Sequence, residues 1–377
     1  MITGEYPPQA GGVSDYSRMV ARGLAAAGDT VCVYAPENPG VDPEDEGVGI
    51  RRLPGHFGVR ALAELARSVA RGANARMLIQ YVPHAFGMKA MNLPFCLWLY
   101  GHTRRHGGAA VIFHEVNLGF RPGDPLRYRL LDAVTKVMAR LVVRSSAQIY
   151  VVTPAWESLL RRYAADGQPI TWIPVPCTIP VAGDREQIAT ARRRYVSGCG
   201  PVIGHFGTYS PAIAAMLRRT IPRILIDVPA LTMMLIGANG DTFRESLTHE
   251  YPELAVRVVA TGALAAAEIS LAIGSCDVMM QPYPDGVSSR RTTIMAALDH
   301  ARAIVTTHGA LTEPLWEKSG AVVLVAAGDF EGFAAAVSEL IADESRRRRY
   351  EAAAKALYAE RFDLSHTIQV LRASACG

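Results

Sequence analysis

The sequence predicts an α/β protein with two domains, each built on a parallel β-sheet that helices cover on both faces. Its 377 residues exceed the usual length of one domain and fit two domains of common size. Half of the residues are hydrophobic and 20% are charged, which allows a large core. Short, continuous apolar runs alternate with helical patterns along the chain, as in buried parallel sheets.

The first half of the chain supplies the elements of one sheet. It opens with Met1–Thr3, which is very short for a first strand, so either this strand is stunted or the natural start lies upstream. A helix is predicted from Ser14 to about Ala27. Further strands are expected at 31–34, 77–82, 110–113, 148–152 and 170–174, with helical stretches at 59–73 and 126–144.

The second half repeats this alternation after an interruption. Between 174 and 200 lie Pro174, Pro176, Pro180 and an arginine-rich helical stretch, which predicts a connection between domains. Strands are then expected at 201–206, 231–236, 256–260, 278–281, 303–306 and 322–325, before a helical tail at 330–373. We expect a first domain at 1–180, a linker at 181–200, a second domain at 201–355 and a final helical segment at 356–377.

Composition and charge argue against several classes of protein. The formal net charge of +4 is small for this length and disfavours a dedicated nucleic-acid binder. The six cysteines form no Cys-x-x-Cys pair or Cys/His cluster, so we expect reduced thiols, a cytoplasmic protein and no zinc site. We expect no signal peptide before Gly4. The most apolar run, 86–100, contains Lys89 and Asn92 and is too short to span a bilayer.

A pair of glycines, Gly11 and Gly12, lies between the first strand and the first helix. Glycine permits positive φ angles and lets a ligand approach the backbone closely. The free N–H groups and partial positive charge of a helix N-terminus favour phosphate. A plain strand–helix turn is the alternative, because a lone glycine pair indicates phosphate binding only weakly.

Three regions together resemble the glycosyltransferase family 4 type, which has the two-domain GT-B fold. The first is Glu5-Tyr6-Pro7-Pro8 with Gly11-Gly12-Val13, followed by a helix, Gly28-Asp29 and a strand. The second is Leu235-Ile236-Gly237 with Thr261-Gly262-Ala263-Leu264, a helix containing Glu268 and Cys276-Asp277-Val278. The third is 281–291 with 295–298, 304–307 and Gly309. In order and spacing, these regions cover most of the chain.

The resemblance implies two Rossmann-like domains that face each other across a cleft. The C-terminal domain would bind a nucleotide sugar, the N-terminal domain would bind the acceptor, and the last helix would cross back to the N-terminal domain. The implied reaction moves a sugar from a UDP- or GDP-sugar to a hydroxyl of a glycan, lipid-linked or small-molecule acceptor, with retention at the anomeric carbon. No cofactor is implied, and no metal is expected because no Asp-x-Asp motif follows a strand.

The implied donor site departs from the family pattern at two points. In the family, two glutamates separated by seven residues contact the sugar hydroxyls and the ribose, and the matching positions here are Asp285 and Thr293. Glu313 lies where the family often has another glutamate and could replace the second one. Family members often carry an arginine and a lysine near 204–211, where this chain has neither. The implied donor contacts are Gly11, Gly12, Gly207, Thr208, Gly237, Gly262, Ser288, Ser289, Arg290, Arg291, Thr293 and Glu313.

Arg290 and Arg291 are expected to supply the missing positive charge. Ser288 or Ser289 is a good N-cap for the helix that runs through Met295, which would place both arginines in its first turn. Positive charge there opposes the helix dipole and so suits a compensating anion. The alternative is that one arginine pairs with a local acid such as Asp285.

The catalytic candidates are His114, Asp285 and Gly12. His114 ends a predicted strand, where ligands of parallel sheets collect, and the family often has a histidine there near the reacting sugar. A structural histidine at a strand end is the alternative. The acceptor candidates are Glu5, Tyr6, His84 and Glu115, and for His84 the alternative is packing within a loop.

Basic residues in the first half lie near an apolar run at 93–99. Such a surface can dock peripherally on anionic lipid, and many relatives act on lipid-linked acceptors at the inner membrane face. The alternative is a solvated helix face beside a buried core helix. The basic residues are Arg104, Arg105, His106, Arg121, Arg127, Arg129, Lys136, Arg140 and Arg144.

Three other functions remain open. A sugar-nucleotide epimerase shares the GT-B fold, but the Pro-Pro-x-x-Gly-Gly opening fits it poorly. A phosphorylase or synthase of a small disaccharide also performs a retaining transfer. A non-catalytic pseudo-glycosyltransferase, which binds a nucleotide sugar or a partner enzyme, is suggested by Thr293 and by the missing arginine–lysine pair.

Overall fold

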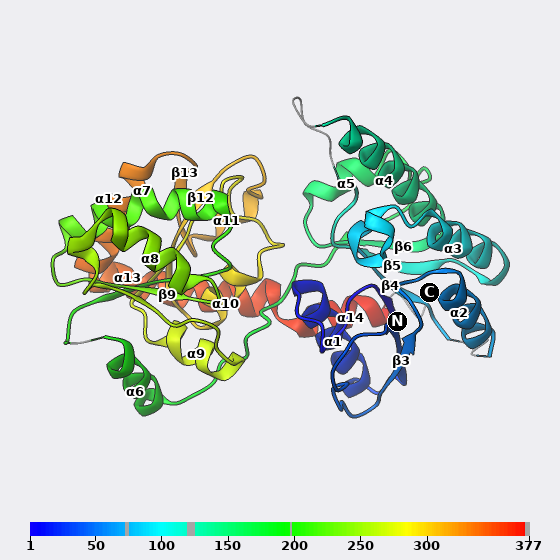
Figure 1. The fold of residues 1–377 in the computed structure, drawn as a ribbon, viewed down its shortest axis with the longest axis horizontal. Coiled ribbons are helices and arrows are strands. Elements are labelled where there is room, and N and C mark those ends of the chain that lie inside the picture. The colour runs from blue at the N-terminus through cyan, green and yellow to red at the C-terminus, as the bar shows by residue number, and fades with distance from the viewer. Residues whose placement is uncertain (72–74, 119–124, 197, 374–377) are drawn as a thin grey trace. The chain divides into compact units, whose positions relative to one another are not determined.

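The structure is a computed structural model that describes residues 1–71, 75–118, 125–196 and 198–373. The chain divides into two compact units (Figure 1). Unit 1 comprises Met1–Val175 and Leu364–Gly377, and unit 2 comprises Pro176–Asp363. Each unit contains one sheet, and every pair of neighbouring strands in both sheets is parallel. This arrangement confirms the predicted fold class.

The sheet of unit 1 has seven strands in the order β3-β2-β1-β4-β5-β6-β7. The strands are β1 (Ile2–Thr3), β2 (Val31–Pro36), β3 (Val48–Leu53), β4 (Leu78–Tyr81), β5 (Ala109–Phe113), β6 (Ser146–Val151) and β7 (Ile170–Trp172). The helices are α1 (Gly12–Ala26), α2 (Val59–Arg71), α3 (Leu93–His106), α4 (Leu126–Arg144), α5 (Ala155–Leu160) and α14 (Leu364–Ala373), with short turns η1 (Pro83–Phe86) and η2 (Met88–Ala90).

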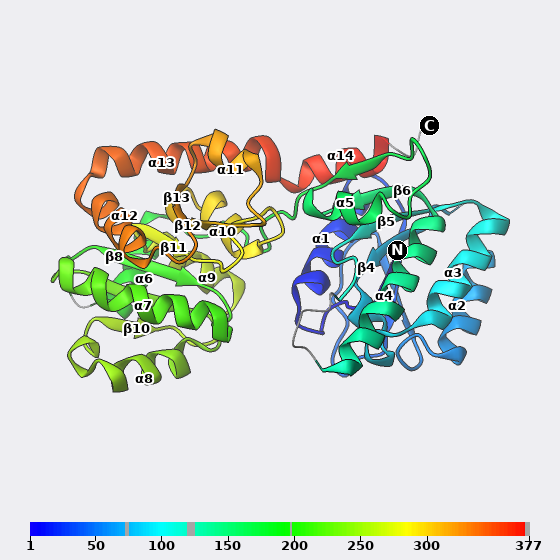
Figure 2. The same ribbon diagram turned by 90° about the horizontal axis from the view of Figure 1, so that it is seen from above.

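Two cores cover the faces of this sheet. On one face, Leu99 of α3 and Val142 of α4 pack in a cluster with strand residues. On the other face, Tyr16 of α1 packs in a cluster with Leu371 of α14. Figure 2 shows the ribbons of these two helices. Because helices lie on both faces, a central strand such as β5 is buried at all its residues, which explains its continuous apolar sequence.

The sheet of unit 2 has six strands in the order β10-β9-β8-β11-β12-β13. The strands are β8 (Val202–Phe206), β9 (Thr232–Ile236), β10 (Val258–Ala260), β11 (Val278–Gln281), β12 (Ala303–His308) and β13 (Val323–Ala326). The helices are α6 (Arg185–Tyr195), α7 (Pro211–Asp227), α8 (Gly240–Glu250), α9 (Ala266–Gly274), α10 (Thr292–Asp299), α11 (Pro314–Ser319), α12 (Phe330–Ala342) and α13 (Glu344–Leu357), with the turn η3 (Pro252–Leu254).

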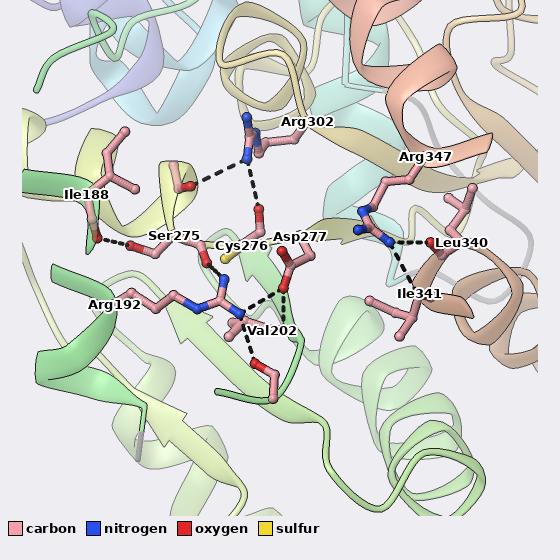
Figure 3. Close-up of polar contacts among 12 residues, drawn as sticks. Ile188, Arg192, Val202, Ser275, Cys276, Asp277, Arg302, Leu340, Ile341 and Arg347 are labelled. Carbon is pink, nitrogen blue, oxygen red and sulfur yellow. Dashed lines mark hydrogen bonds and ion pairs between the residues drawn. The ribbon is translucent and has the colours of Figure 1, made fainter. Parts of the chain in front are cut away.

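The arginine-rich stretch predicted as a linker belongs to unit 2, where it forms α6. The guanidinium of Arg192 donates to the carbonyl oxygen of Ser275 at 2.6 Å (Figure 3). It also donates to the carbonyl oxygen of Gly200 at 2.8 Å. The same group pairs with Asp277 at 3.0 Å. These carbonyls follow the end of α9 or precede β8, so the arginine satisfies groups that have no helical or sheet partner. The chain leaves unit 1 at Val175 rather than at 180.

Two further arginines bind carbonyl groups at helix ends in the same way. Arg302 donates to the carbonyl of Cys276 at 3.1 Å, and Arg347 donates to the carbonyls of Leu340 and Ile341 at 3.0 and 3.1 Å (Figure 3). These bonds secure the carboxyl ends of α9 and α12. Arg192, Arg302 and Arg347 are therefore structural.

The final segment also differs from the predicted 356–377. α13 ends at Leu357, a π-helical turn η4 follows at Tyr358–Phe362, and both belong to unit 2. The ring of Phe362 stacks on Trp316 at 5.7 Å between centroids. Within the predicted final segment, the part that belongs to unit 1 begins at Leu364, with α14. In the described ranges, none of the helices combines the length and the apolarity that crossing a membrane requires.

Candidate functional site

In unit 2, the loops after β8, β9 and β10 meet at the carboxyl edge of the sheet. The backbone N–H of Gly207 donates to the carbonyl of Ile236 at 3.1 Å, and Gly237 forms a bridge with Gly262. A Cβ atom on Gly237 would lie 2.3 Å from the carbonyl oxygen of Gly207, and its φ is 125°. Only glycine fits this position. The structure thus brings together Gly207, Gly237 and Gly262, with Thr208 held by Asn239 through a 3.1 Å hydrogen bond.

A second loop, at 283–291, lies against the loop that follows β12. The backbone N–H of Tyr283 donates to the hydroxyl of Thr307, and that of Val287 donates to the Thr307 carbonyl, each at 2.8 Å. The N–H of Leu311 donates to the carbonyl of Asp285, also at 2.8 Å. These bonds fix the backbone that carries Asp285.

Both arginines of this loop pair with Asp285. Nη2 of Arg290 and Nη2 of Arg291 each lie 3.3 Å from Oδ2 of Asp285. The guanidinium of Arg291 also lies over the ring of Tyr283, 4.9 Å from its centroid. One carboxylate against two guanidinium groups leaves a formal charge of +1, so this cluster can attract an anion.

The predicted N-cap is wrong. α10 begins at Thr292, its N-cap residue is Arg291, and no side chain caps it. The hydroxyl of Ser289 instead donates to Oε1 of Glu313 at 2.7 Å, because this buried carboxylate needs donors. The two arginines therefore precede the helix, and the expectation that they lie in its first turn is also wrong.

Thr293 and Glu313 are both engaged within the protein. The hydroxyl oxygens of Thr293 and Tyr283 lie 2.8 Å apart. The Glu313 carboxylate is 7% exposed and accepts from the N–H of Ser289, at 3.0 and 3.1 Å, and from Nε1 of Trp316, at 2.7 Å. Both of its oxygens are used, so Glu313 anchors the loop in this structure rather than presenting a free carboxylate to a ribose.

Three buried polar atoms lie near this edge, and sequence reasoning named one of the residues, Ser288, but missed His205 and Gln281. Nε2 of His205, Oε1 of Gln281 and Oγ of Ser288 have no hydrogen-bond partner among the described residues. Nδ1 of His205 lies 2.9 Å from the carbonyl of Met280, and burial lowers the pKa of the imidazole to about 4. Nδ1 must therefore donate, which leaves Nε2 as an acceptor. A single polar residue inside each apolar run, His205 in β8 and Gln281 in β11, is the signal that identifies them.

In unit 1, three predicted acceptor residues follow three neighbouring strands. Glu5 follows β1, His84 lies in η1 after β4, and Glu115 follows β5. Nε2 of His84 is 3.9 Å from Oε1 of Glu5, and Nδ1 is 3.4 Å from Oε2 of Glu115. Gly11 also lies here, because a Cβ on it would be 2.9 Å from Oε2 of Glu5.

Burial and mutual interaction shift the pKa values of His84 and Glu5 in this cluster. The hydrogen bond with Glu115 raises the pKa of His84, although burial opposes it. Burial raises the pKa of Glu5, while His84 lowers it. α1 begins at Gly12 with Gly11 as its N-cap residue and no capping side chain, so its first N–H groups adjoin the cluster without a side-chain acceptor.

His114 and Tyr6 lie deeper than expected. His114 is 8% exposed, its Nε2 lies 2.8 Å from Oε1 of Gln80, and burial lowers its pKa to about 4. It is neutral near pH 7, and its catalytic role stays a prediction. Tyr6 is fully buried in a cluster with Val33 of β2, and the expected contact of its side chain with an acceptor stays a prediction.

The described part of the chain contains no group of three or more His, Cys, Asp or Glu residues arranged to hold a metal ion. Its five cysteines, at 32, 96, 177, 199 and 276, are unpaired.

Two family models match the sequence. Residues 11–176 match a glycosyl transferase 4-like domain, and residues 200–343 match the group 1 glycosyl transferases. No protein of curated function matches the sequence.

Solved structures share the fold along the whole chain. Sucrose-phosphate synthase from Thermosynechococcus elongatus aligns with a TM-score of 0.71 at 16% identity, covering 99% of this chain and 94% of that one. Anabaena HepE in complex with UDP and glucose gives 0.70 at 16% identity, covering 100% and 98%. A UDP-forming α,α-trehalose-phosphate synthase from Burkholderia xenovorans gives 0.72 at 10% identity, covering 100% and 99%.

The two matched domains follow each other in the order that the motifs predict, and each lies almost wholly within one parallel-sheet unit. The chain therefore belongs to the family 4 type of glycosyltransferases with the GT-B fold.

Proposed function

We propose that this glycosyltransferase moves a sugar, with retention of anomeric configuration, from a nucleoside diphosphate sugar to an acceptor hydroxyl. The observation that carries the proposal is the cluster of Arg290, Arg291 and Asp285 on an anchored loop. It lies at the carboxyl edge of a parallel sheet, where such sheets bind ligands. Binding of UDP by HepE supports a UDP-sugar as the first donor to test, with a GDP-sugar second.

Each part of the cluster has a role in this reaction. The bond between the anomeric carbon and the diphosphate breaks, so negative charge develops on the leaving diphosphate. The two guanidinium groups stabilise that charge, and the carboxylate of Asp285 accepts hydrogen bonds from sugar hydroxyls. In unit 1, Glu5, His84 and Glu115 bind the acceptor. No metal or cofactor takes part.

Calorimetric titration with UDP and GDP tests the donor site. We expect saturable binding of one nucleotide and a strong loss of affinity when Arg290→Ala and Arg291→Ala are combined. The matched control combines Arg218→Ala with Arg223→Ala on α7, because these arginines pair with Glu250 and Glu331 on the surface of the same unit. Loss of affinity in the control as well would contradict a specific role for Arg290 and Arg291.

A non-catalytic nucleotide-sugar-binding protein is the second candidate. One observation favours it: Thr293 replaces the second glutamate of the family motif, and its hydroxyl is engaged by Tyr283. Incubation with UDP-sugar and a panel of acceptors separates the two functions, since this candidate binds the donor without turnover. An epimerase would convert the donor sugar without any acceptor.

We also propose that α4 contacts an anionic membrane surface from the cytoplasm. Residues 126–130 at its start are all exposed, and Leu126, Leu130 and Val137, at helical spacing, are 75%, 62% and 49% exposed. Exposed Arg140 and Arg144 lie on the same helix. Apolar side chains bordered by basic ones suit a bilayer with anionic headgroups.

Part of the predicted basic and apolar surface does not contribute. Phe95 and Leu99 of α3 are buried in the core, as in the alternative interpretation, and Arg121 lies outside the described residues. Only α4 therefore carries the proposal.

Co-sedimentation with vesicles tests the membrane contact. We expect the protein to bind phosphatidylglycerol vesicles but not phosphatidylcholine vesicles, and Leu126→Ser with Leu130→Ser to release it. Val41→Ser is the matched control, because Val41 is 87% exposed on a loop away from α4. Equal binding of the double variant and the wild type would contradict a role for α4.

A further inference from the structure

In the loop at 283–291, one carboxylate oxygen of Asp285 pairs with both arginines, Arg290 and Arg291. Nη2 of Arg290 and Nη2 of Arg291 each lie 3.3 Å from Oδ2 of Asp285. The side chains of Asp285, Arg290 and Arg291 are 40%, 24% and 27% exposed. A shared oxygen at this distance is a weak partner for two guanidinium groups, each of which can donate two parallel hydrogen bonds to an oxyanion.

The backbone on both sides of this cluster is held in place. A Cβ atom on Gly309 would lie 2.6 Å from the carbonyl carbon and oxygen of Asp285, so the two loops are in close contact. The N–H of Ser289 is bound by Glu313, one residue before Arg290. Any exchange of partners must therefore take place by side-chain rotation.

Arg291 retains capacity to donate. Its Nε is buried and has no hydrogen-bond partner among the described residues. Its guanidinium packs over the ring of Tyr283, which orients it without using its N–H groups. The pairing with Asp285 thus leaves a buried donor unsatisfied, a state that a multivalent oxyanion would relieve.

We propose that, in the free protein, the carboxylate of Asp285 pairs with the two guanidinium groups that bind the donor diphosphate. When the donor binds, its diphosphate replaces this carboxylate as their partner. The diphosphate takes the two guanidinium groups, and the released carboxylate then accepts hydrogen bonds from the sugar hydroxyls. Recognition of the sugar is thereby coupled to the presence of the diphosphate. This inference rests on the proposed function and concerns the same site.

The exchange has an unusual consequence for mutagenesis. An ordinary binding residue lowers affinity when it is removed. Asp285 competes with the diphosphate, so Asp285→Asn, which keeps the shape and removes the charge, makes a diphosphate bind more tightly. Because the competing contacts are partly exposed ion pairs, we expect a gain of about threefold to tenfold.

Calorimetry with inorganic pyrophosphate measures this effect without a base or a sugar. The proteins are the full chain, Asp285→Asn, the double variant Arg290→Ala with Arg291→Ala, and the triple variant that combines them. Glu317→Gln is the matched control, since Glu317 is an exposed carboxylate of the same unit that pairs with His308 at 2.9 Å. It removes one negative charge without touching the cluster.

The expected result is tighter pyrophosphate binding by Asp285→Asn, a change below about twofold in Glu317→Gln, and no effect of Asp285→Asn once both arginines are absent. Equal or weaker binding by Asp285→Asn, when the wild type binds, overturns the exchange and leaves the proposed function standing. Absence of binding of both pyrophosphate and UDP by all the folded proteins overturns the exchange and the proposed function together.

Discussion

The carboxylate of Glu313 accepts three contacts from one residue, Ser289. Two involve the backbone N–H, at 3.0 and 3.1 Å, and the third involves the hydroxyl, at 2.7 Å. Through them, a residue that precedes α11 holds the loop that precedes α10. The position of Arg290 and Arg291 therefore depends on a buried acid rather than on a helix cap.

Replacing this acid tests its anchoring role. Glu313→Gln keeps the side-chain shape but sets an NH₂ group against the donors of Ser289 or Trp316. Leaving a buried donor unpaired costs about 1–3 kcal/mol, so we expect the free energy of unfolding to fall by that amount in urea titrations. Glu317→Gln, on the exposed side of α11, is expected to change it by about 0.5 kcal/mol at most. Equal effects of the two substitutions would contradict the anchor.

The site is expected to discriminate poorly between ribose and deoxyribose. Thr293 has no carboxylate for the ribose diol, its hydroxyl is bonded to Tyr283, and Glu313 is used within the protein. UDP and 2′-deoxy-UDP should therefore bind with affinities within about threefold of each other.

A designed variant provides the control for this prediction. Thr293→Glu places an acid in the first turn of α10, where the helix dipole favours it. We expect it to bind UDP about tenfold more tightly than 2′-deoxy-UDP, through a hydrogen bond to a charged group. A strong preference of the wild type for UDP would show that another group holds the ribose.

Buried histidines make the stability of the protein sensitive to acid. Burial lowers the pKa of His205 to about 4 from an ordinary value of 6.5, and that of His114 moves in the same way. Between these pH values the unfolded chain binds protons that the folded protein does not, so the free energy of unfolding falls as the pH drops from 6.5 to 4.

His205→Asn should flatten this dependence, because asparagine can still donate to the carbonyl of Met280 but does not titrate. We expect the slope to fall by about 1 kcal/mol per pH unit, measured as urea unfolding at several pH values. His249→Gln, at an exposed position on α8, should leave the slope as it is. If the dependence of the free energy of unfolding on pH were the same in His205→Asn, this imidazole would take up its proton in the folded protein as readily as in the unfolded chain.

Two glycines should respond oppositely to alanine. At Gly237, φ is 125° and a Cβ would lie 2.3 Å from the carbonyl oxygen of Gly207, so Gly237→Ala should lower the free energy of unfolding by about 1–3 kcal/mol. Gly101, within α3, has no atom within 4 Å of an added Cβ. Gly101→Ala should therefore raise the free energy by about 0.5–1 kcal/mol. Urea titrations of both variants measure these two changes. Destabilisation by Gly101→Ala would contradict the prediction that an added Cβ at Gly101 meets no other atom.

The sequence predicts elements best where both faces of the sheet are buried. β5 is a continuous apolar run, β11 is apolar up to Gln281, and both are strands. β3 was not predicted, because this edge strand alternates between half-buried and exposed residues up to the buried Leu53 and contains Gly49, Arg51 and Arg52. Its pairing with β2 supplies a stability that no local pattern shows.

In the site too, some features could be predicted from the sequence and others could not. The glycines and the arginine pair are identifiable from the sequence because the backbone and charge requirements are local. The partners of Ser289, Thr293 and Arg192 are not, since each depends on a contact with a side chain or carbonyl brought near by the fold. An N-cap prediction for Ser289 fails for this reason: a buried acid 24 residues away competes for its hydroxyl.

The packing of α14 constrains the order in which the protein matures on the ribosome. Ile368 and Leu371 lie in the same core cluster as Tyr16 and Val20, which are synthesised some 350 residues earlier. Part of one face of the first sheet therefore stays uncovered while all of unit 2 is translated, and nascent unit 1 exposes an apolar surface that chaperones can recognise. Unit 2, which is one continuous segment, can complete its fold before unit 1 does.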